Sequence, residues 1–121
     1  MSDHTNDRIL VEHRDGCHVV RFLEETLFDP LEVAAVEKQI HEVIAEAPTP
    51  RVILAMETLT HLASSTLSTL ISVRSACQGK GGDAALAGVP DSIMEILRVA
   101  RLDTVFRIYP NTAEAVIGLN G

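Results

Sequence analysis

The chain has 121 residues, of which 46% are hydrophobic and 22% charged, and its formal net charge is −7. This length suits one domain that buries its own core, and the acidic balance argues against binding to nucleic acid or to an anionic membrane surface, both of which need a basic face. Cys17 and Cys77 form neither a disulfide framework nor a zinc pattern. Without an apolar leader or a run long enough to span a bilayer, the chain is expected to be cytoplasmic.

The first part of the chain predicts a hairpin followed by a helix. Residues 1–7 are polar and are expected to be a frayed terminus, with a single domain over residues 8–121. Two short apolar runs flank Asp15-Gly16, a strong hairpin signal. Asp29 is expected to cap a helix with Pro30 at its first position, ending at Pro48. The apolar face of that helix is Val33, Val36, Ile40, Val43, Ile44 and Ala47.

The second part alternates strands with helices. Residues 51–56, 83–87 and 104–109 are expected to be strands. The small residues Ala63-Ser64-Ser65-Thr66, with hydroxyl groups at 64–66, are suited to capping a second helix, and the glycine-rich segment 79–82 ends it. A third helix opens at residues 90–92, and Asn111 caps a fourth. The inward faces of these three helices are expected to be Leu67, Leu70, Ile71 and Cys77, then Ile93, Ile96, Leu97 and Ala100, then Ala115, Val116 and Leu119.

The predicted order of elements is therefore ββαβαβαβα. Strands alternating with single helices indicate an α/β fold with a mixed, largely parallel sheet of about five strands and about four helices. In such sheets, functional residues collect where a strand ends and a helix begins. The connection between residues 56 and 65 is one such place.

Signatures of catalysis are missing from the sequence. The five histidines, at positions 4, 13, 18, 41 and 61, match no metal-ligand spacing. Ser64 and Ser65 lack the glycine elbow of a hydrolase, and the lysine at 80 with its glycines follows a helix rather than a strand, unlike a phosphate loop. We therefore expect no catalytic residue, no cofactor and no metal, and a protein that is not an enzyme.

Three stretches, taken in order, resemble the STAS domains of anti-sigma factor antagonists. After the strand at 51–56, Leu59-Thr60-His61-Leu62-Ala63-Ser64-Ser65-Thr66-Leu67 is similar to the Asp-Ser-(Ser/Thr)-Gly-like motif that opens a helix in that family. Residues 80–89 are similar to the family's basic-Gly-Gly turn and the strand after it. Residues 96–106 resemble its third helix and Leu-Asp-x-x-Phe exit. By element order, the resemblance covers residues 8–119.

The resemblance implies a bacterial partner-switching regulator of transcription that is controlled by serine phosphorylation. In this family, an anti-sigma factor that is also a serine kinase phosphorylates the first serine of the motif, and the unmodified antagonist sequesters that kinase and frees a sigma factor. By position, Ser64 is the implied phosphoacceptor, with Ser65 or Thr66 as the fallback. A serine phosphatase is a further partner that the resemblance admits. The implied partner-binding residues are His61, Leu62, Ala63, Ser64, Ser65 and Thr66.

Two alternatives stay open. Ala63 and Thr66 stand where the family pattern has aspartate and glycine, which favours an STAS scaffold or sensory-complex domain that binds protein partners without phosphorylation. The loop between Met56 and Ala63 lies at a strand end, which is a common position for a small-ligand pocket.

Overall fold

The computed structural model describes residues 8–27 and 29–121, so the expected frayed terminus at 1–7 lies outside the described residues. The elements follow in chain order as β1 (Ile9–Arg14), β2 (Cys17–Phe22), β3 (Thr26–Leu27), α1 (Pro30–Glu46), β4 (Arg51–Ala55), β5 (His61–Leu62), α2 (Ser64–Gln78), β6 (Asp83–Ala87), α3 (Asp91–Val99), β7 (Arg107–Tyr109) and α4 (Thr112–Asn120). Of the described helices, none combines the length and the apolar character that a bilayer crossing requires.

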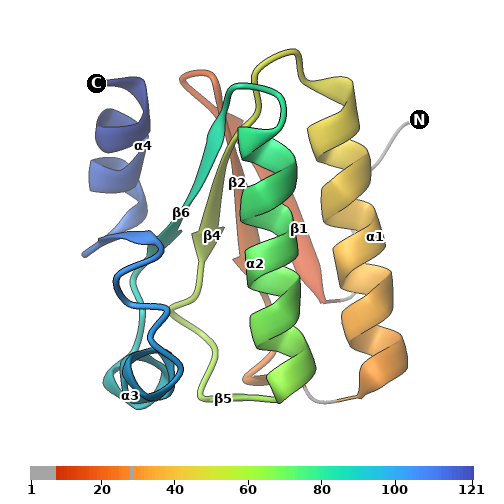
Figure 1. The fold of residues 1–121 in the computed structure, drawn as a ribbon, viewed down its shortest axis with the longest axis vertical. Coiled ribbons are helices and arrows are strands. Elements are labelled where there is room, and N and C mark those ends of the chain that lie inside the picture. The colour runs from red at the N-terminus through yellow and green to blue at the C-terminus, as the bar shows by residue number, and fades with distance from the viewer. Residues whose placement is uncertain (1–7, 28) are drawn as a thin grey trace.

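The main sheet has five strands in the order β1-β2-β4-β6-β7 (Figure 1). β1 and β2 form an antiparallel hairpin whose turn residues, Asp15 and Gly16, both have positive φ, as a tight two-residue hairpin turn requires. The remaining neighbours, β2 with β4, β4 with β6 and β6 with β7, are parallel. The mixed, largely parallel five-stranded sheet with four helices is confirmed.

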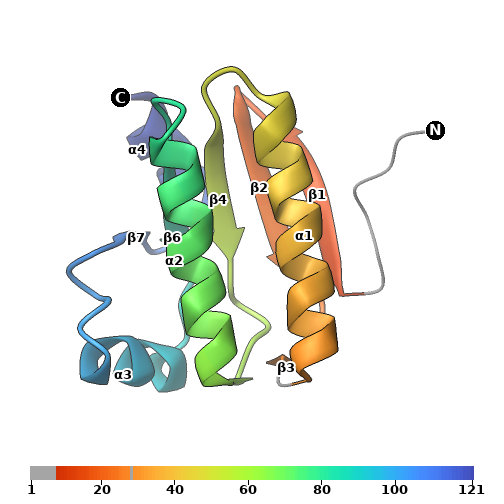
Figure 2. The ribbon, with the colours of Figure 1, turned by 45° about the vertical axis from the view of Figure 1, so that its right-hand side comes forward.

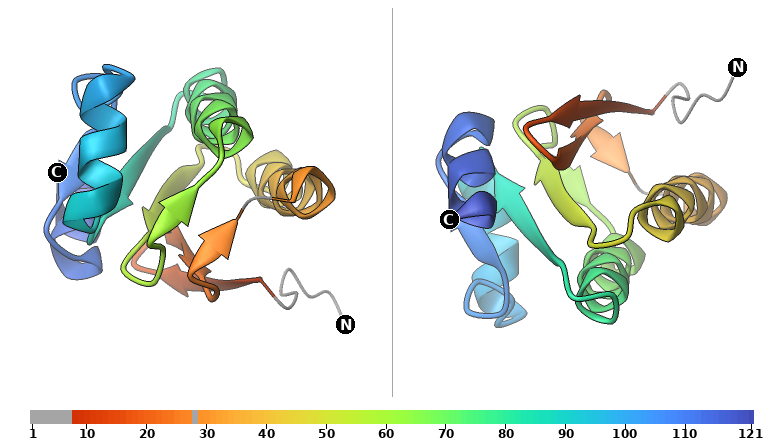
Figure 3. Two further views of the ribbon diagram at one scale, coloured as in Figure 1. Left: turned by 90° about the horizontal axis from the view of Figure 1, so that it is seen from below. Right: turned by 90° about the horizontal axis from the view of Figure 1, so that it is seen from above.

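Helices cover both faces of the sheet. α1 and α2 lie side by side on one face, and α4 packs on the other (Figures 1, 2 and 3). The larger core lies under α1 and α2 and includes Val20, Leu54 and Leu86, whereas the smaller core under α4 includes Val19 and Ile53. The alternation of the strand side chains between the two faces produces these two cores. α3 covers neither face and lies beyond the ends of β4 and β6, near the start of α2 (Figure 1).

The inward face of α2 differs from the expected one. Leu70 and Cys77 are buried as expected, but Ile71 is 43% exposed. The buried positions are Thr66, Thr69, Leu70, Val73 and Cys77. Because these positions recur at helical spacing, they share one face of α2. Leu67 follows the buried Thr66 and Ile71 follows the buried Leu70, so both lie beside that face rather than on it. The expected face of α3 is also partly wrong: Ile93 and Leu97 are buried, but Ala100 is exposed and follows the end of the helix.

Two strand expectations need correction. The last strand was expected over 104–109, but β7 covers only Arg107–Tyr109. Arg101 has a left-handed backbone with φ 62°, and the N–H groups of Val105 and Phe106 donate to the carbonyl of Leu102, so these residues form turns and leave the sheet. The expected order also missed β3 and β5, which pair in parallel as a separate two-stranded sheet.

Candidate functional site

The segment before α2 is anchored from two sides. The N–H groups of Thr60 and His61 donate to the carbonyl of Glu25 at 2.8 and 3.3 Å, and Thr60 Oγ1 donates to the same oxygen at 3.2 Å. From the start of α3, Ser92 Oγ donates to the carbonyl of Thr60 at 3.4 Å. Because the segment is tied to the β2–β3 connection and to α3, the start of α2 has a defined place at this end of the molecule (Figure 3).

The expected side-chain cap of α2 is absent. The N-cap is Ala63, with φ −91° and ψ 163°, and its side chain makes no capping hydrogen bond. Asp29 of α1 and Asn111 of α4, in contrast, accept from the N–H groups of Leu31 and Glu114. Ser64, Ser65 and Thr66 are therefore the first three helical residues rather than caps. The first turn of α2 contains no acidic residue, which leaves the positive end of this helix uncompensated by a local charge.

The six residues that the sequence places at the site differ in exposure. His61, Ser64 and Ser65 are exposed, and Leu62 and Ala63 are half-buried. Thr66 is only 1% exposed, because the third position of α2 faces the core. A hydroxyl at that position is out of reach of another protein while the helix is formed. Thr66 is therefore removed from the implied phosphoacceptors and partner-binding residues, and Ser64 and Ser65 remain.

A hydrogen bond to α1 fixes the first turns of α2. Thr69 Oγ1 donates to Glu37 Oε1 at 2.9 Å and lies 3.1 Å from the carbonyl of Ser65. Thr69 is buried and Glu37 is partly exposed, so this part-buried bond links the first turns of α2 to α1. Ser64, in the same turns, is exposed.

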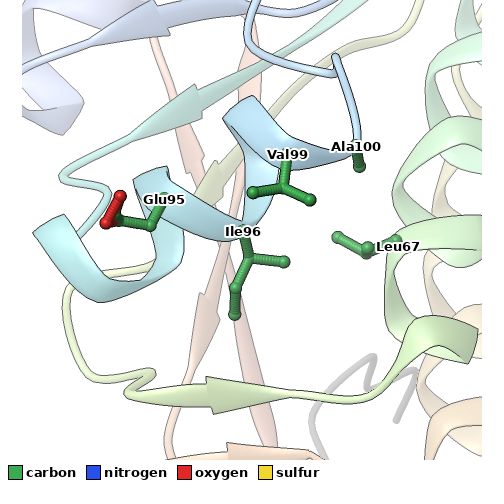
Figure 4. Close-up of a pocket in the computed structure, with 5 residues that line it drawn as sticks. All are labelled: Leu67, Glu95, Ile96, Val99 and Ala100. Atoms are coloured by element: carbon green, nitrogen blue, oxygen red, sulfur yellow. The ribbon is translucent and has the colours of Figure 1, made fainter.

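An apolar groove lies between α2 and α3. Its volume is about 350 Å³. Leu67 of α2 faces Ile96 and Val99 of α3 and Ala100, which follows that helix. Glu95 points away from Leu67 at the rim (Figure 4). We call these five residues the α2–α3 groove. Val99 is 86% exposed, so the groove has an exposed aliphatic side chain at its edge.

Ser64 and the α2–α3 groove share one face of α2. Ser64, Leu67 and Ile71 are three and four residues apart along the helix, the spacing that places side chains above one another. The groove was not predicted, because apolar spacing assigned Leu67 and Ile96 to the core. One residue did point to the groove in the sequence: Val99 is apolar but lies outside the helical spacing of the buried residues Ile93 and Leu97.

Other reactive groups lie away from this end. Burial raises the pKa of the Cys77 thiol to about 12 and also raises the pKa of Cys17, so both are protonated and poor nucleophiles at neutral pH. The rings of His13 and His18 face each other across the hairpin with centroids 4.0 Å apart. Within residues 8–27 and 29–121, no three His, Cys, Asp or Glu side chains are grouped to hold a metal ion.

Comparisons with known structures agree with this architecture. An anti-sigma factor antagonist (STAS) domain protein from Planctomyces limnophilus is 22% identical with a TM-score of 0.86, covering 94% of this chain and 99% of that one. Unphosphorylated SpoIIAA, an anti-sigma factor antagonist, is 19% identical with a TM-score of 0.79, covering 93% and 96%. The phosphorylated form of SpoIIAA from Bacillus also matches, at 18% identity and a TM-score of 0.69 over 89% and 96%.

The same fold occurs in transport proteins. A sulfate transporter family protein from Wolinella succinogenes is 20% identical with a TM-score of 0.72, covering 87% of this chain and 85% of that one. A comparison with curated protein sequences gives no match. The family model for the STAS domain matches residues 8–115, which is most of the described chain. The protein therefore belongs to the STAS domain family.

Proposed function

We propose that this STAS domain is a partner switch of the anti-sigma factor antagonist type. Unmodified, it binds an anti-sigma factor that is also a serine kinase, through the exposed start of α2 and the α2–α3 groove. Phosphorylation of Ser64 releases that partner, and a serine phosphatase resets the switch. The observation that carries this proposal is the exposed hydroxyl of Ser64 on the same helix face as an apolar groove.

The helix start explains why phosphorylation is compatible with folding. Ala63 provides no side-chain acceptor for the first N–H groups of α2, and such N–H groups together with the helix dipole favour an anion. A phosphate on Ser64 is therefore expected to stabilise the first turn rather than unfold it.

The same phosphate opposes docking. It adds about −1.5 to −2 charge, and burying an unpaired charge against a partner costs several kcal/mol. A loss of about 3 kcal/mol weakens binding by about a hundredfold. Because Leu67 and Val99 are apolar, they offer no counter-charge to offset this cost.

A second function is a scaffold that binds partners without phosphorylation. Ala63 leaves Ser64 without the carboxylate neighbour of the family pattern, and the family's glycine position is filled by the buried Thr66. In this alternative, the α2–α3 groove is still the docking surface, but a negative charge at residue 64 leaves the affinity unchanged.

A binding experiment separates the two functions. The wild-type protein and the variants Ser64→Glu, Ser64→Ala and Ser65→Glu are titrated against the switch-protein kinase encoded by the same genome. The partner switch predicts that Ser64→Glu weakens binding by about tenfold or more, whereas Ser64→Ala binds like the wild type. Equal affinity of all four proteins would favour the scaffold.

The role of the α2–α3 groove is tested with a matched pair on α3. Val99→Gln removes an exposed aliphatic side chain and is expected to weaken partner binding without changing stability, because Val99 buries little area in the free protein. The control, Arg98→Gln, changes the neighbouring exposed residue, which does not line the groove. If both variants bind equally well, the partner does not use the groove.

A further inference from the structure

A second hollow, which we call the strand-end cavity, lies where β4, β6 and β7 end. It has a volume of about 570 Å³, within the range of about 300–1,000 Å³ typical of small-molecule sites. Its apolar walls are Val89, Met94, Ile108 and Pro110. The strand-end cavity and the α2–α3 groove share no lining residue. α3 contributes Met94 to the cavity, and it contributes Ile96 and Val99 to the groove.

Backbone hydrogen bonds join the strands where they end at the strand-end cavity. Met56 N–H donates to the carbonyl of Ala87 at 3.0 Å, and Gly88 N–H donates to the carbonyl of Tyr109 at 3.0 Å. The hydrogen bonding between the parallel strands thus continues to the point where they leave the sheet. The carboxyl ends of neighbouring parallel strands are where α/β folds most often bind ligands.

Glu57 is placed in this cavity by a glycine. Gly88 has φ +64°, and a Cβ built on it would lie 2.5 Å from Glu57 Cγ and 2.9 Å from Glu57 Oε2. The Glu57 side chain therefore lies directly over the backbone of Gly88, in space that any other residue at position 88 would occupy. The glycine allows both the left-handed backbone and the close approach of the carboxylate.

The Glu57 side chain is 47% exposed and forms a long ion pair with Arg21. Arg21 Nη1 lies 3.8 Å from Glu57 Oε1, whereas Arg21 Nε lies nearer to Glu12 Oε1, at 3.2 Å. A carboxylate accepts several hydrogen bonds, so Glu57 has capacity for another charged donor. The cavity thus combines one anionic acceptor with four apolar side chains and the aromatic Tyr109.

We propose that the strand-end cavity binds a small organic ammonium ion. The ammonium group donates a charge-assisted hydrogen bond to Glu57, and its carbon chain packs against Val89, Met94 and Ile108. Carboxylate ligands are rejected by the charge of Glu57, and uncharged alcohols lose the ionic contact. This inference does not depend on the partner switch, because none of these residues belongs to the start of α2 or to the α2–α3 groove.

The test uses n-hexylammonium as the probe, with n-hexanol and n-hexanoate as probes of the same chain length. Each is titrated into the ¹⁵N-labelled protein and followed by NMR chemical shifts. Hexylammonium is expected to shift the amides of residues 57, 88, 89, 94 and 108, with hexanol binding more weakly and hexanoate not at all. Glu57→Gln is expected to weaken hexylammonium binding by about tenfold.

The matched control is Glu42→Gln, which removes another exposed carboxylate, on α1 and outside the lining of both hollows. It is expected to bind hexylammonium like the wild type. Any of three results would overturn the proposal: no shifts at tens of millimolar hexylammonium, equal binding of hexanol and hexylammonium, or an unchanged affinity of Glu57→Gln. The spectra themselves report whether each variant is folded.

Discussion

Gly82 lies directly against the backbone carbonyl of Pro50: a Cβ built on Gly82 would come within 1.8 Å of that oxygen. The next residue, Asp83, donates its N–H to the same carbonyl at 3.1 Å. The backbone just before β6 therefore contacts the backbone just before β4, and no side chain fits between the two segments.

This contact predicts opposite results for two glycine substitutions in one turn. Gly82→Ala is expected to lower the free energy of unfolding by about 2–3 kcal/mol, because the backbone has to move to relieve the clash. Gly79→Ala is the control. Its nearest contact is 3.4 Å away and its φ is −62°, so it is expected to be neutral or to stabilise by up to about 1 kcal/mol. Urea denaturation measures both, and equal effects would contradict the account.

Lys80 supplies a positive charge to the end of α1, which has no basic residue in its own last turn. Its Nζ donates to the carbonyls of Ile44 and Ala45, both at 3.0 Å. Lys80→Met is expected to cost about 1 kcal/mol, because two carbonyls at the negative end of a helix lose a cationic donor. Lys38→Met changes an exposed lysine within α1 and is expected to be close to neutral in the same thermal unfolding measurement. A loss from Lys38→Met as large as that from Lys80→Met would count against the capping role.

Ala63 at the N-cap of α2 predicts that the helix can be stabilised there. Ala63→Asp adds an acceptor for the first N–H groups and a negative charge beside the helix dipole, and is expected to gain about 1 kcal/mol. Ala63→Val adds side-chain volume without an acceptor and is expected to give no gain. Calorimetric unfolding distinguishes the two variants. If Ala63→Asp is no more stable than the wild type, then the first turn already has other partners for its N–H groups.

Cys77 predicts a loss of stability at alkaline pH. Burial, followed by the charge of Asp83, raises the pKa of its thiol to about 12 from an ordinary 9.0. In the unfolded chain the thiol ionises near pH 9, so between about pH 9 and pH 12 the unfolded state binds fewer protons and stability falls as the pH rises. Below pH 9 this contribution is fully present.

The measurement is urea denaturation at pH 8 and pH 10 for the wild type and for Cys77→Ala. The variant is expected to lose less stability between the two pH values than the wild type does, although its overall stability is lower because it leaves a cavity. Equal losses in both proteins would show that the Cys77 thiol does not titrate in this way.

Local signals in the sequence were sufficient to predict most of the helices, strands and turns of the fold. Asp15-Gly16 forms the hairpin turn, and Asp29 and Asn111 cap α1 and α4, because turns and caps depend on residues within a few positions of each other. The basic-Gly-Gly turn is also explained: Lys80 binds the end of α1, Gly81 has φ +83°, and Gly82 packs on Pro50.

Features that depend on contacts between distant segments were not predictable. β3 and β5 have two residues each, too few for a periodic signal. The helix start at Ala63 and Ser64 shifted the buried face of α2, so that Val73 rather than Ile71 enters the core. The α2–α3 groove and the strand-end cavity both depend on the position of α3 relative to other elements, and apart from Val99 no local pattern pointed to either of them.

The partner switch itself is tested most directly by locating the phosphate. The protein is incubated with the switch-protein kinase of the same genome and ATP, and the modified residue is identified by mass spectrometry in the wild type, Ser64→Ala and Ser65→Ala. The account predicts one phosphate on Ser64, which persists in Ser65→Ala and disappears in Ser64→Ala. Phosphate on Ser65, or an unmodified wild-type protein beside a kinase shown to be active, would contradict it.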